Sequence, residues 1–124
     1  RPRPAAQSYD GDHVLFTLEP ELGDRVAEAS RRHDVTVYAW LLTTFLTTLH
    51  KYSGQRDLVV GTPVAGRHHP DVDRLVGFFV NTVPVRSRHR DHDTFEDFLR
   101  RVSATCLGAL DHQDVPFEQI VQRL

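Results

Sequence analysis

Residues 36–64 read TVYAWLLTTFLTTLHKYSGQRDLVVGTPV, and this stretch joins two kinds of secondary structure. Thr36 suits a helix N-cap, apolar residues recur as far as Tyr52, and Gly54 suits the residue that ends the helix. The apolar residues cover most of the helix circumference, so this helix is expected to pack on more than one side. Residues 57–64 form a short apolar run of the kind found in interior strands. A helix that leads directly into such a strand indicates an α/β protein.

The sequence before this stretch predicts a strand and a helix. Apolar residues recur at period two over residues 13–18, which indicates a strand with one face in a core. Pro20 suits the first turn of a helix, and apolar residues continue at helical spacing to about Arg32. Residues 1–12 are rich in proline, glycine and aspartate and are expected to form a linker or a mobile lead-in.

The sequence after residue 64 predicts a second half with the same mixture of elements. A loop at residues 65–67 and a helical turn at residues 72–76 precede a strand over residues 78–86. Pro84 cannot donate a hydrogen bond to a neighbouring strand, so it should lie at a sheet edge or a bulge. The expected total is three strands and four or five helices.

Two helices are expected after a charged turn at residues 89–93. Thr94 and Asp97 have the spacing of a capping box, which starts the helix with the most regular apolar seam in the chain. Pro116 opens the last helix, whose apolar residues repeat at helical spacing up to Leu124. The seam of the earlier helix consists of Phe95, Phe98, Leu99, Val102, Cys106 and Leu110.

Composition excludes several classes of protein. The 124 residues, with 15 Lys+Arg against 17 Asp+Glu, suit one domain or part of one, and the net charge of −2 argues against nucleic-acid binding. The single Cys106 cannot form an internal disulfide. No membrane span or signal peptide is visible, so a cytoplasmic location is expected. The absence of methionine and the last helical pattern, which ends without a cap, indicate a piece of a longer polypeptide.

Structural roles explain the histidine pairs and the cysteine better than catalysis or metal binding does. The paired imidazoles of His68 and His69 before a carboxylate are a possible general-base arrangement, but a solvated loop is favoured. His89 and His92 offer two metal ligands where a catalytic zinc site needs three, so a charged turn is favoured and no metal site is predicted. Cys106 lies on an apolar helix seam and is expected to be a core residue.

Two segments combine polar and apolar residues unusually. VGFFVNT, residues 76–82, places Asn81 and Thr82 at the end of an apolar strand, and HQDVPFE, residues 112–118, places polar residues just before a helix. Purely structural explanations are available for both segments. Asn81 would then be a turn or bulge residue, and Asp114 would be the N-cap of the last helix.

These two segments resemble signature segments in the carboxy-terminal half of condensation domains of nonribosomal peptide synthetases. Residues 52–55 (YSGQ) and 57–67 (DLVVGTPVAGR) also match, and the resemblance covers about residues 14–124 in the family's order and spacing. It implies an α/β fold that is half of a two-lobed, chloramphenicol-acetyltransferase-like structure. Residues 13–124 would then form part of the carboxy-terminal lobe.

The resemblance also implies a reaction and its participants. Condensation domains form an amide bond between an acyl or peptidyl thioester and the amine of an aminoacyl thioester, both held on the phosphopantetheine arms of carrier domains. The implied partners are these carrier domains, the amino-terminal lobe of the same domain and a neighbouring adenylation domain. No cofactor bound directly, no nucleic acid and no membrane are expected.

The resemblance assigns site residues as well. Asn81 and Thr82 would line the tunnel between the lobes. A structural role is expected for the other signature residues, Gly77, Phe79, His112, Gln113, Asp114 and Pro116. The family's catalytic motif, two histidines followed by three variable residues, aspartate and glycine, belongs to the other lobe. The sequence from His68 to Arg74 imitates that motif, but arginine replaces the glycine and no apolar strand precedes it.

No catalytic residue is therefore expected in this chain, and the chain alone is expected to be inactive. An alternative is a non-catalytic platform that binds a carrier or adenylation domain. The sequence upstream of Arg1 would separate the two, because only the enzyme needs a preceding lobe with an intact histidine motif. A stand-alone acyltransferase of the same fold is a third, weaker reading, for which the two signature segments would be unexpected.

Overall fold

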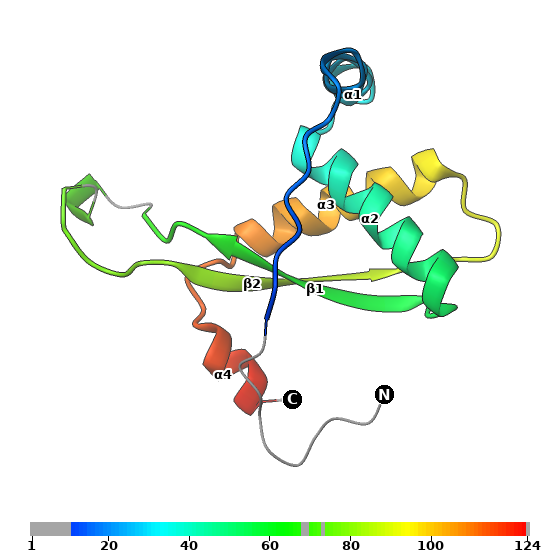
Figure 1. Ribbon diagram of the computed structural model, residues 1–124. Helices are drawn as coiled ribbons and strands as arrows, with labels where there is room; N and C mark the ends of the chain where they lie inside the picture. The colour runs from blue at the N-terminus through cyan, green and yellow to red at the C-terminus, as the bar shows by residue number, and fades with distance from the viewer. Residues whose placement is uncertain (1–10, 68–69, 73, 124) are drawn as a thin grey trace.

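The computed structural model describes residues 11–67, 70–72 and 74–123, which form a two-stranded sheet with helices around it. Figure 1 shows α2 and α3 side by side over one face of the sheet, while α4 lies on the other side, near the start of β2. In chain order the elements are α1 (Pro20–Arg32), α2 (Val37–Ser53), β1 (Asp57–Val64), the short 3₁₀ helix η1 (Pro70–Val72), β2 (Asn81–Arg88), α3 (Phe95–Leu110) and α4 (Phe117–Gln122).

The helix ends follow local signals in the sequence, as predicted. The Thr36 hydroxyl accepts a hydrogen bond from the Ala39 N–H at 3.0 Å, and α2 ends at Gly54 in the left-handed region, with φ of 70°. Thr94 and Asp97 form the expected capping box of α3. These signals act within one helical turn, so they are effective whatever the rest of the chain does.

The core lies between α2, α3 and the inner face of the sheet. Cys106 is 7% exposed and belongs to it, which confirms the expected structural role, and burial raises the pKa of its thiol. Helix α2 contacts both α1 and α3 but keeps an exposed apolar side that includes Leu41 and Phe45. The buried cluster consists of Leu42, Leu46, Val85, Phe98, Val102 and Cys106.

The strand predicted over residues 13–18 is wrong, and the sheet has two strands instead of three. Residues 11–19 have no secondary structure, and Val14 and Leu15 are 85% and 87% exposed. A strand needs a partner, and β1 and β2 pair only with each other among the described residues. Phe16 and Leu18 instead line an apolar groove that α2 and β1 form, and Figure 1 shows this segment crossing α2 and the sheet.

The remaining differences concern where the elements lie. Strand β1 is an edge strand instead of an interior one, because the sheet of the described residues has two strands and β1 pairs with β2 alone. Strand β2 starts at Asn81, later than predicted, so Asn81 begins a strand instead of ending one. Pro84 pairs opposite Gly61 at a sheet edge, as expected. The helical turn predicted at residues 72–76 lies at Pro70–Val72.

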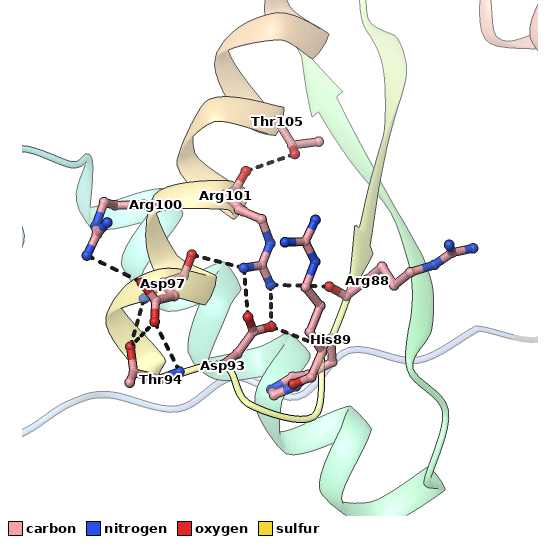
Figure 2. Close-up of polar contacts among 9 residues, drawn as sticks. Arg88, His89, Asp93, Thr94, Asp97, Arg100, Arg101 and Thr105 are labelled. Carbon is pink, nitrogen blue, oxygen red and sulfur yellow. Dashed lines mark hydrogen bonds and ion pairs between the residues drawn. The ribbon is translucent and has the colours of Figure 1, made fainter.

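The turn between β2 and α3 is held by one buried carboxylate. Figure 2 shows the Asp93 carboxylate facing the Arg101 guanidinium, with one hydrogen bond of 2.8 Å from Arg101 Nη1 and a shorter one from Nη2. The Arg90 N–H also donates to Asp93 at 2.8 Å, and Arg101 reaches the Arg88 carbonyl at 3.4 Å. The hydrogen bonds from Arg101, followed by the one from Arg90, lower the pKa of Asp93 from 3.8 to about 2.

We predict that Asp93→Asn removes part of the protein's sensitivity to acid. The lowered pKa of Asp93 stabilises the fold above about pH 4, and this stabilisation is lost as the pH falls from about 4 to about 2. The variant should lose about 1 kcal/mol at pH 7 and show a shallower decline below pH 4. Urea denaturation followed by the fluorescence of Trp40, which packs against Phe95, measures both effects.

Asp91→Asn is the matched control, because the exposed Asp91 pairs with Arg56 beside the same turn. This variant should stay within about 0.5 kcal/mol of the unmodified protein. An equal loss in both variants would contradict the special role of Asp93.

Candidate functional site

The two signature segments meet around one cavity of about 490 Å³ at the start of β2. Residues 78–82 form one wall, and residues 113, 114 and 116–118 form the other. Gly66, just after β1, completes the lining. The sequence separates the two walls by about thirty residues of β2 and α3, so only the tertiary fold brings them together.

The Asn81 side chain joins the two walls. Its Nδ2 donates to the carbonyl oxygens of Gln113 and Val115, at 2.8 Å each, and its Oδ1 accepts the Phe117 N–H at 3.2 Å. Phe117 is the first residue of α4, whose N-cap residue, Pro116, makes no side-chain cap. Asn81 therefore satisfies a helix N–H that has no partner in its own helix. The alternative in which Asp114 is the N-cap residue is wrong.

These contacts determine what the Asn81 amide can do chemically. Both Nδ2 hydrogens are used by backbone carbonyls, so the amide has no N–H left to donate to a molecule in the cavity. Its oxygen keeps one lone pair beyond the Phe117 bond. In this arrangement Asn81 shapes the cavity by fixing the backbone of residues 113–117.

The other residues of the first signature segment lie around Asn81. Thr82 lines the cavity and pairs opposite Pro63 in the sheet. The Phe79 ring lies over Gly77, where an added Cβ would come within 3.0 Å of it. Phe78 is 90% exposed and lines the cavity.

Only part of the second signature segment lines the cavity. Gln113, Asp114 and Pro116 line the cavity, and Gln113 is half-buried. His112 is exposed in the turn after α3, where its N–H bonds to the Ala109 carbonyl at 3.2 Å, and it does not line the cavity.

Gly66 and Arg67 were not identified from the sequence as residues of the site, although they end the matching stretch 57–67. Gly66 adopts φ of 62°, and an added Cβ would lie 2.0 Å from the Phe79 carbonyl oxygen. Arg67 places its guanidinium over the Phe79 ring at 4.3 Å and donates to three backbone carbonyls. The signal in the sequence that could have identified them is a glycine followed by an arginine just after a predicted strand.

The histidines that the structure describes do not line this cavity. His68, His69 and Asp73 lie outside the described residues. His89 stacks on His50, with ring centroids 4.3 Å apart, and contacts the Phe98 ring at 4.6 Å. Within the described ranges, no group of three or more metal-ligating side chains is present.

A family model described as the condensation domain matches residues 1–124. The chain belongs to the condensation-domain family. Tyrocidine synthase 3 of Brevibacillus parabrevis is 46% identical over 123 residues, which are 99% of this chain and 2% of that protein. Surfactin synthase subunit 1 of Bacillus subtilis (strain 168) is 42% identical over 99% of this chain and 3% of its own length.

Solved condensation domains have the same fold. A four-domain nonribosomal peptide synthetase, solved in its holo form with AMP and glycine, superimposes on 97% of this chain and 9% of its own, with a TM-score of 0.91 and 29% identity. The first condensation domain of the calcium-dependent antibiotic synthetase, with a substrate analogue, covers 84% of this chain and 23% of its own, at a TM-score of 0.78 and 25% identity. The predicted family and mixed α/β class are confirmed, with two strands instead of three.

The chain thus spans only a small part of its relatives, 2% to 3% of the length of the two synthases. None of the helices in the described part of this condensation-domain chain has both the length and the apolar character to cross a membrane.

Proposed function

We propose that residues 13–124 form part of the carboxy-terminal lobe of a condensation domain, and that the residues lining the cavity at Asn81 form one wall of its reaction tunnel. Residues 1–12 would act as a linker. The observation that carries this proposal is the meeting of residues 78–82 with residues 113, 114 and 116–118 around one cavity, because these residues belong to the two stretches that resemble family signatures.

The proposed reaction is aminolysis of a thioester. The amine nitrogen of an aminoacyl thioester attacks the carbonyl carbon of an acyl or peptidyl thioester, the C–N bond forms and the C–S bond breaks. The sulfur then leaves as a thiol with the proton that the nitrogen loses. Holding the two reactants in this orientation lowers the activation free energy by an amount on the order of several kcal/mol.

The chain's own contribution is a wall of mixed polarity. Apolar side chains of Phe78 and Val80 would exclude water beside the phosphopantetheine arms, while Thr82 offers a hydroxyl. Asn81 would line the tunnel as a support for the opposite wall, since its donors are occupied. The family's histidine motif, on the other lobe, would handle the proton, so this chain alone would be inactive.

The proposed partners follow from the same reaction. Carrier domains would present both thioesters on phosphopantetheine, the amino-terminal lobe would close the tunnel, and an adenylation domain would be a neighbour in the same cytoplasmic synthetase. A similar solved structure is a four-domain nonribosomal peptide synthetase in its holo form, bound to AMP and glycine, which supports a multidomain assembly.

A bulky side chain in the cavity tests the proposal. In the full-length protein, Val80→Trp should reduce amide formation between loaded carrier domains by about tenfold or more, because small displacements of oriented reactants are costly. Val80 is 48% exposed and lines the cavity. Product formation is measured by mass spectrometry of the amide-containing thioester on the acceptor carrier domain, with loading of the carrier domains checked separately.

Val59→Trp is the matched control, because Val59 is 60% exposed on β1 and does not line this cavity. Its amide formation should be unchanged. Equal activity of the two variants would contradict the assignment of this cavity to the tunnel, and amide formation by the isolated chain would contradict its proposed inactivity.

A further inference from the structure

Among the described residues, one arginine makes most of the contacts with residues 74–80, the segment that leads into β2. Leu75, Val76 and Phe78 are 53%, 104% and 90% exposed, so burial in a core does not fix residues 74–80. Between residues 74 and 80, the only backbone–backbone hydrogen bond to a described partner runs from the Leu75 N–H to the Val72 carbonyl, at 3.2 Å. Yet this segment supplies one wall of the cavity.

Arg67 makes four contacts, one with η1 and three with this segment. Its Nη1 donates to the carbonyl oxygens of Val72 and Leu75, at 2.5 and 3.0 Å, and its Nη2 reaches that of Gly77 at 3.4 Å. The guanidinium carbon lies 4.3 Å from the centre of the Phe79 ring. A planar guanidinium can satisfy several carbonyls at its edge while an aromatic ring covers its face, which an ammonium cannot do.

The neighbouring glycine directs Arg67 to these partners. Gly66 has φ of 62° and passes so close to the Phe79 carbonyl that a Cβ would lie 2.0 Å from its oxygen. The chain turns at this glycine, just after β1, and Arg67 contacts Val72, Leu75, Gly77 and Phe79. Gly66 and Arg67 together connect the end of β1 to the cavity wall.

We propose that Arg67 is a positioning residue of the condensation site, which sets where Phe78, Phe79 and Val80 stand in the tunnel wall. This inference rests on the proposed function. Arg67 does not touch the reacting atoms in this view. It acts through the backbone carbonyls that it binds and through the Phe79 ring.

The first test measures the segment itself in the full-length protein. Arg67→Ala should speed amide hydrogen exchange of Leu75 by at least about tenfold, because the Leu75 N–H bonds to the Val72 carbonyl and Arg67 holds the carbonyls of both residues with charge-assisted hydrogen bonds. Arg67→Lys should behave like Arg67→Ala, since the charge alone cannot replace the planar group. Arg74→Ala, which removes an exposed arginine of the same segment, should leave the exchange unchanged.

The second test measures amide formation between loaded carrier domains. Both Arg67 variants should lose about tenfold in kcat, as expected when reacting groups are displaced, while loading of the carriers is unchanged. Millimolar ethylguanidinium should restore much of the activity of Arg67→Ala, and ethylammonium should not. Such rescue would not occur if the variant were merely misfolded.

Several outcomes would overturn the inference. Unchanged exchange in Arg67→Ala, full activity in Arg67→Lys, or faster exchange with unchanged kcat would each exclude a positioning role. If the unmodified full-length protein forms no amide bond, the proposed function fails, and the exchange comparison still shows whether Arg67 holds the segment.

Discussion

Asn81→Asp is expected to destabilise the protein more than Asn81→Ala, although aspartate has nearly the same shape as asparagine. The Asn81 Nδ2 lies 2.8 Å from each of the Gln113 and Val115 carbonyl oxygens. Replacing this donor by a carboxylate oxygen brings three acceptors together with no hydrogen between them. Alanine removes the bonds without adding repulsion, and water can reach some of the released groups in this open cavity.

The expected losses at pH 7 differ clearly. Asn81→Ala should cost about 2 kcal/mol, since three hydrogen bonds at a half-buried site are lost. Asn81→Asp should cost about 3 to 4 kcal/mol, because a charge is added beside unpaired carbonyls. Hydrogen exchange of residues 112–119 measures the local effect, and urea denaturation measures the global one.

The pH dependence of Asn81→Asp gives a second, independent readout. The two carbonyls disfavour the charged carboxylate and outweigh the single Phe117 N–H that favours it, so the new aspartate should have a pKa above its ordinary value. A raised folded-state pKa means that stability is present at low pH and is lost as the pH rises through that pKa. The variant should therefore approach the unmodified protein as the pH falls from 7 to about 4.5, where its protonated form donates one hydrogen bond.

Gln119→Glu is the control for the change from amide to carboxylate, because Gln119 is exposed on α4. It should alter stability by less than about 0.5 kcal/mol at any of these pH values. An Asn81→Asp variant as stable as the unmodified protein, or one whose deficit does not change with pH, would refute the bridging role of Asn81.

Gly66→Ala is expected to have a comparably large effect, and Gly54→Ala separates its two causes. Both glycines have positive φ, 62° at Gly66 and 70° at Gly54, so alanine is strained at either position by about 1 to 2 kcal/mol. An added Cβ meets nothing within 4 Å at Gly54, whereas at Gly66 it lies 2.0 Å from the Phe79 carbonyl oxygen. The difference between the variants therefore reports the contact with Phe79.

We expect Gly66→Ala to cost about 3 kcal/mol or more, because steric overlap in a packed region adds to the backbone strain. Phe79 must move away, which also separates it from the Arg67 guanidinium. Urea denaturation of both variants gives the two free energies, and hydrogen exchange of the Leu75 N–H, which bonds to the Val72 carbonyl, should become faster in Gly66→Ala alone. Equal free energies would mean that the segment accommodates the methyl group without strain.

The sequence and the structure agree best where the cause of the structure is local. Thr36, Gly54 and the pair Thr94 and Asp97 set helix ends through contacts within one turn of the chain. The middle of the α3 seam was also predictable, since helical periodicity shows which side chains share a face, and Phe98, Leu99, Val102 and Cys106 are buried. The two ends of the predicted seam, Phe95 and Leu110, are exposed. The signature residues of the site could be named as well, by their resemblance to a family.

What those residues contact was not predictable, because their partners are distant in the sequence. The alternation at residues 13–18 indicates a strand, yet whether a strand forms depends on a neighbour with free backbone groups. Asn81 reads as a tunnel residue or a turn residue, and only the fold places it opposite carbonyls 32 and 34 positions away. Backbone capping is encoded within a few residues, while pairing between segments depends on how the whole core brings them together.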